Sequence, residues 1–219
     1  MLPAFEELPF SVRKELPGWL LFWACLQREA GAEDRLAQLR NQTVAGVRER
    51  LTLDRLAAHP AVAAMRRLFK AAGCDPSRYR PASEALLRRV LKGEDLPAIS
   101  PLVDINNCLS LELAVPCCVM REGSFTPPLL WRSGLPGESY QSLRGPFNLE
   151  GKPLLLDADG PIDAPISGNE KVKVTPETQK AWLVAYLPQQ AVPAEAARDA
   201  IQRLILAAPV VQVTLVALS

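Results

Sequence analysis

Two pairs of adjacent residues capable of chemistry stand in one stretch of the chain, VDINNCLSLELAVPCC, which runs from Val103 to Cys118. The amides Asn106 and Asn107 lie near its start beside an apolar stripe, and two cysteines, Cys117 and Cys118, close it. Asparagine is disfavoured inside a helix because its amide competes for backbone partners. Two together beside apolar residues indicate that one amide points inward and meets a partner. That partner is either the backbone of a neighbouring loop or a bound ligand, and the sequence leaves both open.

The single histidine and the cysteines offer few other routes to catalysis. A Ser-His-Asp or Cys-His arrangement could use only His59, which precedes Pro60 at an expected helix start and favours a local structural role. Adjacent strand cysteines usually pack as small residues on opposite faces of the sheet, and a redox-active pair is the alternative. The sequence contains no GxxxxGK[ST], GxGxxG, HExxH or GxSxG motif. Because the cysteines form no CxxC pair, we expect no metal, no cofactor and no disulfide scaffold.

Composition is that of a soluble globular protein. The chain has 219 residues, 48% of them hydrophobic and 22% charged, enough for one large domain or two small ones. The apolar run Trp19–Leu26 is too short to span a bilayer and lacks the flanks of a secretory signal. We therefore expect a cytoplasmic protein with reduced thiols.

The formal net charge is only +1, yet one segment is strongly basic. Only Asp75 and Glu84 oppose the basic residues there, so the segment has an excess of six positive charges. Such a face can steer a polyanion, whereas the simpler interpretation is a pair of solvated amphipathic helices. The basic residues of the segment, and our candidates for RNA contacts, are Arg66, Arg67, Lys70, Arg78, Arg80, Arg88, Arg89 and Lys92.

Hydrophobic periodicity and capping signals predict helices in the first half of the chain and at its end. The clearest begins at Ser100, an N-cap residue followed by Pro101 in the first turn and by Asp104, which suits the helix dipole. Gly73 and Gly93 are typical helix-ending residues. The expected helices cover residues 33–50, 60–72, 81–92, 100–113 and 193–207.

Strands are expected mainly after Pro116. Two strongly apolar runs, residues 19–27 and 210–218, read as buried strands. Shorter runs separated by turn residues cover 117–121, 129–132, 139–143, 153–157, 162–166 and 182–187. This order predicts an α+β fold, with helices of the N-terminal half packed in layers on antiparallel or mixed sheets and a closing helix–strand unit. We expect a single domain over residues 1–219, with an extension over 1–55 and the closing unit over 189–219.

Ordered motifs over residues 55–188 resemble a known family. VDINNCLSLELAVP carries Asp104, Asn107, Glu112 and Pro116, and ISGNEKVKVTPETQKAWLV carries Glu170, Glu177 and Thr178. Both stretches resemble the B3/B4 editing domain of the bacterial phenylalanyl-tRNA synthetase β subunit. The run DPSRYRPASEALLRRVLKGEDLPAISPLVDINN is similar to family members that contain this domain without a synthetase.

The resemblance implies an α+β domain with a small pocket between sheet and helix, which hydrolyses the ester of mischarged tRNA. In the family an asparagine and a histidine lie near the ester, and a glutamate and a glycine-lined wall recognise the tyrosine hydroxyl. Asn107 matches the asparagine and Glu170 the glutamate. The histidine position holds Cys118, and Pro165 replaces part of the glycine wall. Both are departures, because a thiol lacks the hydrogen bonding of an imidazole and proline restricts the backbone.

These implications lead to one main functional hypothesis and two alternatives. The first is a tRNA-editing-like domain with Asn107 at the ester, Asn106 beside it, and Cys118, Pro165 and Glu170 against the substrate. The basic segment would then hold tRNA phosphates. One alternative is a non-catalytic tRNA-, RNA- or amino-acid-binding module that has lost the chemistry, and another is a scaffold with a vestigial pocket.

Overall fold

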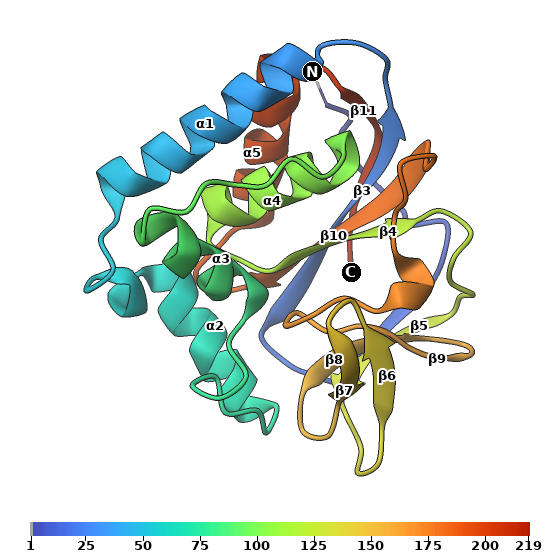
Figure 1. Ribbon diagram of the computed structural model, residues 1–219. Helices are drawn as coiled ribbons and strands as arrows, with labels where there is room; N and C mark the ends of the chain where they lie inside the picture. Colours follow the sequence, from blue (N-terminus) through green and yellow to red (C-terminus); the bar gives the residue numbers. More distant parts are fainter. Residues whose placement is uncertain (1) are drawn as a thin grey trace.

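The structure, a computed structural model, describes residues 2–219 and has a five-stranded sheet at its centre (Figure 1). Its strands are β1 (Phe5–Glu6), β3 (Trp19–Arg28), β4 (Cys117–Arg121), β10 (Lys180–Pro188) and β11 (Val211–Leu218). Their order is β1-β11-β3-β10-β4, and β3 runs antiparallel to both β10 and β11. Because both faces of β3 and β10 are covered, nearly every side chain of these two strands is buried, which explains their continuous apolar sequence.

The helices gather on one side of this sheet, at the left of Figure 1. Among them α4 contacts α1, α5 and β4, so one edge of the sheet lies directly under it. The helices are α1 (Glu33–Arg50), α2 (Pro60–Ala71), α3 (Ala82–Leu91), α4 (Pro101–Leu113) and α5 (Ala194–Ala207), with short 3-10 helices η1 (Leu56–Ala58) and η2 (Glu170–Val172).

The start of α4 is fixed by local contacts. The Ser100 hydroxyl accepts a hydrogen bond from the Val103 N–H at 3.4 Å. The buried carboxylate of Asp104 accepts from the Ile99 N–H at 3.0 Å and pairs with Arg40 of α1 at 2.5 Å. The predicted cap and first turn of this helix are therefore confirmed, and its rotation about its own axis is set.

A second, four-stranded sheet and a hairpin lie at the lower right of Figure 1. The sheet contains β2 (Val12–Lys14), β5 (Leu129–Ser133), β8 (Pro153–Asp157) and β9 (Gly160–Asp163), and the hairpin is β6 (Ser139–Ser142) with β7 (Gly145–Asn148). Trp131 of β5 stacks on Tyr186 of β10, with ring centroids 4.9 Å apart. Aromatic packing of this kind joins the two sheets through a shared core.

The expected α+β fold is confirmed, with helices where the periodicity placed them. One strand is wrong at its end: the strand expected over residues 162–166 stops at Asp163. Pro165 has no N–H to donate, and the Ile166 N–H turns back to the Ala164 carbonyl at 2.6 Å. The chain therefore leaves the sheet after Asp163. The single-domain interpretation stays a prediction.

Among the helices of residues 2–219, none is long and apolar enough to cross a membrane.

Candidate functional site

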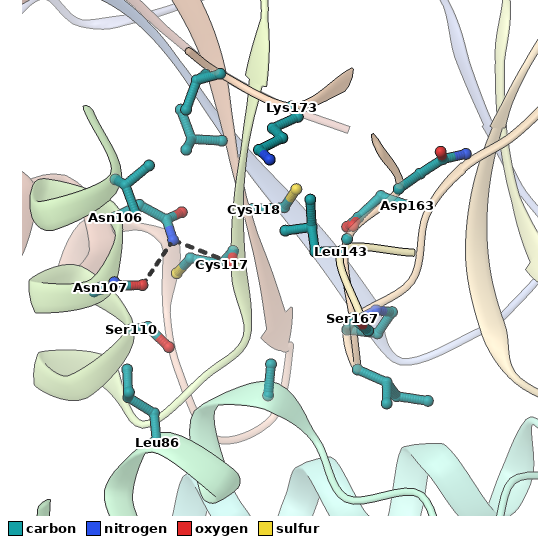
Figure 2. A pocket seen from close by; sticks show the side chains of 18 of the residues that line it. Leu86, Asn106, Asn107, Ser110, Cys117, Cys118, Leu143, Asp163, Ser167 and Lys173 are labelled. Carbon is teal, nitrogen blue, oxygen red and sulfur yellow. Dashed lines mark hydrogen bonds between the residues drawn. The ribbon is translucent and has the colours of Figure 1, made fainter. Parts of the chain in front are cut away.

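A cavity of about 460 Å³ lies between α4, β4 and the loop that follows β9 (Figure 2). One wall comes from α3 and α4, a second from Cys117 and Cys118 of β4, and a third from residues 163–169. Most of the lining is apolar, with a few polar groups converging on the space, as in small-molecule sites. Because β9 ends at Asp163, the loop that follows it can form one side of the cavity.

The two amides of α4 are linked to each other and to β4. Asn106 Nδ2 donates to the Cys117 carbonyl and to Asn107 Oδ1, both at 3.4 Å (Figure 2). Asn106 is only 6% exposed, and its Oδ1 has no hydrogen-bond partner within residues 2–219. The sequence left open whether the inward amide binds the backbone of a neighbouring segment or a ligand, and the Asn106 side chain can do both. Its nitrogen caps a backbone carbonyl, while its buried oxygen is left for a ligand or water.

Cys118 faces a carboxyl group that the sequence analysis did not single out. The Tyr186 hydroxyl donates to Asp163 Oδ2 at 2.5 Å, and the Cys118 thiol lies close enough to Asp163 for each group to affect the pKa of the other. Burial raises the pKa of the Cys118 thiol well above its usual range, and the nearby Asp163 charge adds to the shift. Burial also raises the pKa of Asp163, to about 7. Cys118 is accordingly a neutral thiol rather than a poised nucleophile.

The neighbouring Cys117 is also protonated. Its thiol donates weakly to the Val115 carbonyl at 3.7 Å, and burial raises its pKa. All five cysteines of the chain are free. A packing role therefore describes Cys117 better than redox chemistry.

The predicted substrate contacts divide between the cavity and the surface. Asn106, Asn107, Cys118 and Pro165 all line the cavity. Glu170 begins η2, is exposed, and does not belong to the lining, although its neighbour Asn169 does. Its predicted recognition role therefore has no support from this geometry and stays a prediction.

The basic segment is partly neutralised by one buried carboxylate. Glu84 of α3 is 1% exposed and binds Arg66 through two hydrogen bonds of 2.8 Å, with Arg88 at 3.0 Å and Arg80 at 3.5 Å. Burial opposes ionisation of Glu84, but the guanidinium hydrogen bonds hold its pKa below the usual range. These three arginines have a structural role that the charge count could not reveal.

Compared with the three arginines at Glu84, the other basic side chains of the segment are freer to contact a ligand or RNA. Arg89 pairs with Glu94 at 2.8 Å, and it also lines the cavity. Arg67, Lys70, Arg78 and Lys92 are exposed and form no ion pair within the described part of the chain. Two further cations at the cavity, Arg144 and Lys173, were not predicted, because they lie outside the basic segment.

His59 stands at the N-terminus of α2, half-buried, and does not line the cavity. Burial lowers its pKa, so the imidazole is neutral near pH 7. The described residues, 2–219, contain no group of three or more His, Cys, Asp or Glu side chains placed to hold a metal ion. The polar side chains of the cavity thus comprise a carboxyl group, amides, neutral thiols, the Ser110 and Ser167 hydroxyls, and the cations of Arg89, Arg144 and Lys173, without an imidazole among the described residues.

The fold and the cavity beside α4 define an α+β domain with a ligand-sized pocket between sheet and helix. The chain belongs to the B3/4 domain family, whose model matches residues 64–203. The resemblance found in the motifs is thereby confirmed.

Comparison with solved structures finds an N-terminal fragment of the phenylalanyl-tRNA synthetase β-subunit from Pyrococcus horikoshii. The match has 14% sequence identity and a TM-score of 0.47, and covers 99% of this chain and 53% of that one. The chain therefore spans about half the length of that fragment. No curated protein matches the chain.

Proposed function

We propose that this chain is an editing-like domain that binds tRNA and hydrolyses the ester of mischarged aminoacyl-tRNA. The observation that carries the proposal is the cavity beside α4 in a B3/4 family chain, with Asn107 in its wall. Its volume of about 460 Å³ suits an aminoacyl group. An aminoacyl ester needs little more than a positioned water and donors for the developing oxyanion.

Asn107 is the donor we assign to the oxyanion. Its Oδ1 accepts from Asn106, and Asn106 is itself held by the Cys117 carbonyl. This arrangement leaves the Asn107 Nδ2 hydrogens for another acceptor. Water would attack the ester carbonyl carbon, and Nδ2 would stabilise the oxyanion. The carbon–oxygen bond to the ribose would then break, with the proton from water completing the ribose hydroxyl and releasing the amino acid.

The test is a deacylation screen on a panel of correctly and incorrectly charged tRNAs. We expect hydrolysis of a subset, and Asn107→Ala should lower the rate about 100-fold, the usual cost of one oxyanion donor. Asn41→Ala, at an exposed asparagine of α1 outside the cavity, is the matched control and should keep the wild-type rate. Full activity in Asn107→Ala would remove the assigned role.

The exposed, unpaired cations supply the phosphate contacts in this proposal. Arg67→Glu combined with Lys70→Glu should weaken tRNA binding about tenfold at low salt and flatten its salt dependence. Arg35→Glu combined with Arg55→Glu, at exposed positions outside the basic segment, is the control matched in charge. Equal losses in both variants would assign the effect to overall charge rather than to this face.

One observation favours a second candidate, a tRNA- or amino-acid-binding module without chemistry. Cys118 stands where the family has a histidine, and no imidazole lines the cavity among the described residues. This candidate predicts tRNA binding without deacylation across the whole panel.

A further inference from the structure

Asp163 is a buried carboxyl group without a cationic partner. It is 1% exposed, and within residues 2–219 no lysine, arginine or histidine forms an ion pair with it. The Tyr186 hydroxyl donates to Oδ2 at 2.5 Å, and this donor and the nearby Cys118 thiol are both neutral. Buried carboxylates are normally paired, so Asp163 either holds a proton or takes its positive charge from a ligand.

The second carboxyl oxygen of Asp163 borders the cavity. A β-carbon placed on Gly168 would lie 3.6 Å from Asp163 Oδ1 and 3.8 Å from Leu143, so glycine leaves that side of the oxygen uncovered. Figure 2 shows the carboxyl pointing toward Cys118 and Leu143, and all three residues line the cavity. A ligand in the cavity can therefore reach this oxygen directly.

A second acceptor without a partner among the described residues, Asn106 Oδ1, lies on the opposite side of Cys117 and Cys118 from Asp163. Asn106 Oδ1 is buried and unsatisfied, while its nitrogen is committed to the Cys117 carbonyl. Turning the amide over would set two acceptor oxygens against each other, so the hydrogen-bond network fixes its orientation. Asp163 and Asn106 thus present acceptors from the two sides of Cys117-Cys118.

We propose that this cavity binds a primary ammonium group with Asp163 as its counter-charge, while Asn106 Oδ1 accepts from another donor of the same ligand. An ammonium group has three donors and no acceptor, and it supplies the charge that a hydroxyl lacks. Arg144 and Lys173, which line the same cavity, suit an anion attached to the same ligand. The ligand class is an amino acid whose carboxyl end is free or joined to a nucleotide. In the second case the inference rests on the proposed function.

The charge state of Asp163 makes the ammonium site dependent on pH. The groups that face Asp163 are Cys118 of β4, Tyr186 of β10 and Tyr140 of β6, and all three are neutral near pH 7 because burial raises each pKa. With a pKa of about 7, Asp163 is half ionised at neutrality. An ammonium ligand favours the carboxylate, so binding should release a proton and tighten more than about tenfold between pH 5.5 and 7.5.

The experiment compares probes that differ only in the amine. Alanyl, leucyl, phenylalanyl and lysyl amides of 3′-amino-3′-deoxyadenosine are titrated calorimetrically beside their counterparts that lack the α-amine. We expect at least tenfold tighter binding of one or more amine probes by the wild-type protein, and loss of that preference in Asp163→Asn. Equal affinity with and without the amine overturns the inference. The wild-type comparison needs no variant, so the test stands even where Asp163→Asn is unstable.

Further arms separate the sources of the ammonium and of the anion. Tight binding of the 6-aminohexanoyl probe, which keeps only the side-chain amine of lysine, would place that amine at Asp163. Binding of a free amino acid but of no adenosine probe supports the ammonium site and overturns the proposed function. Binding of neither overturns both. Asp157→Asn, a buried aspartate outside the cavity, is the matched control and should keep the wild-type preference.

Discussion

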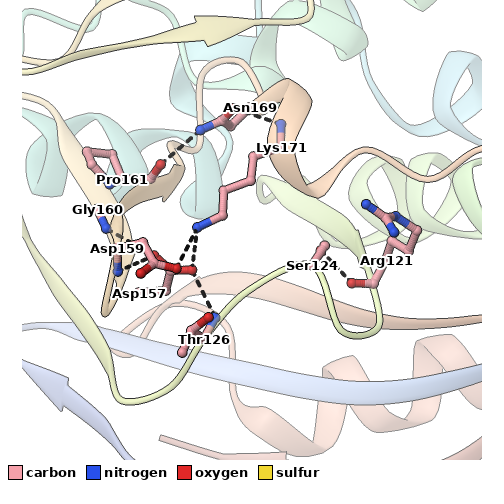
Figure 3. Close-up of polar contacts among 9 residues, drawn as sticks. All are labelled: Arg121, Ser124, Thr126, Asp157, Asp159, Gly160, Pro161, Asn169 and Lys171. Carbon is pink, nitrogen blue, oxygen red and sulfur yellow. Dashed lines mark hydrogen bonds and ion pairs between the residues drawn. The ribbon is translucent and has the colours of Figure 1, made fainter.

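Two buried aspartates end the paired strands β8 and β9, and their surroundings are opposite. Asp157 accepts hydrogen bonds from the backbone N–H groups of Thr126, Asp159 and Gly160 at 2.9–3.0 Å, and pairs with Lys171 at 2.7 Å (Figure 3). Burial opposes its ionisation, but Lys171 and the backbone donors hold the Asp157 pKa below the usual range. Asp163 has neutral donors only, and burial raises its pKa to about 7.

The difference separates a structural carboxylate from a candidate binding group. Asp157 ties three separate segments together, and its hydrogen-bonding capacity is used within the protein. The neutral Tyr186 donor does not offset the free-energy cost of burying the charge of Asp163, which faces a cavity. Groups with pKa values shifted by burial in a cleft are enriched at functional sites. Both aspartates are buried, so burial does not distinguish them. The hydrogen-bond and ion-pair partners of each carboxyl group do.

The largest expected effect concerns the pH dependence of stability. Because the folded-state pKa of Asp163 is about 7 and its ordinary value 3.8, the folded state holds a proton that the unfolded state has lost between those pH values. Stability should therefore fall as the pH rises through this window. Asp163→Asn should remove up to about 4 kcal/mol of that fall. Urea unfolding at pH 4.5, 5.5, 6.5 and 7.5 measures it.

Asp157→Asn supplies the contrast in the same experiment. The folded-state pKa of Asp157 is lowered, so its stabilising contribution is present above its ordinary pKa of 3.8 and lost only below it. The wild-type and Asp157→Asn curves should run parallel from pH 4.5 to 7.5. Parallel curves for Asp163→Asn as well would contradict the assigned difference.

The next effect is on stability at a single pH. Asp157→Ala removes the partner of Lys171 and leaves the Thr126 and Gly160 N–H groups unsatisfied, so we expect a loss of about 3 kcal/mol at pH 7. Chemical denaturation measures it. Asp159→Ala, at an exposed side chain 3.4 Å from Lys171, should change stability by less than about 0.5 kcal/mol. Similar losses in both variants would show that the ion pair, rather than burial, dominates.

Glu84 extends the comparison, because it is a buried carboxylate paired by arginines. Glu84→Gln should cost about 2 kcal/mol and, by releasing the guanidiniums of Arg66 and Arg88, tighten tRNA binding a few-fold at low salt. Denaturation and filter binding measure the two effects. Glu94→Gln, at an exposed partner of Arg89, should leave stability nearly unchanged. Weaker tRNA binding in Glu84→Gln would show that the positions of the arginines matter more than their release.

Local signals predicted α4 well, because its cap and first turn depend on contacts within a few residues. Ser100 and Pro101 act where the sequence placed them. The short strands β1, β2 and β7 were not predicted, since two to four residues carry no periodic signal and each is defined by its partner strand.

The candidate site was predicted on the helix side only. Asn107 matches the family motif, Asn106 precedes it, and Cys118 stands at the family's histidine position; all three line the cavity. Asp163 was missed because it lay within the strand expected over residues 162–166, and the break that Pro165 makes in that strand was not recognised. Asp163 and Cys118 are far apart in the sequence, so no local pattern could show that they lie close together. Likewise, the spacing of Arg80, Glu84 and Arg88 fits helical pairing, but nothing local placed Arg66 on the same carboxylate.

The smallest expected effect tests the open side of Asp163 without changing its charge. Gly168 has no positive φ, and a methyl group there would meet Asp163 Oδ1 and Leu143 at ordinary contact distances. Gly168→Ala should therefore alter stability by less than about 0.5 kcal/mol. It should nevertheless weaken binding of the amine probes several-fold, because the methyl group occupies the approach to the carboxyl oxygen. Gly46→Ala is the matched control, because Gly46 lies on α1 outside the cavity, has no positive φ, and a methyl group there would meet only the flexible end of Arg50. Unchanged amine binding in Gly168→Ala would mean that ligands reach Asp163 from another side, which would separate its role in the cavity from the loop after β9.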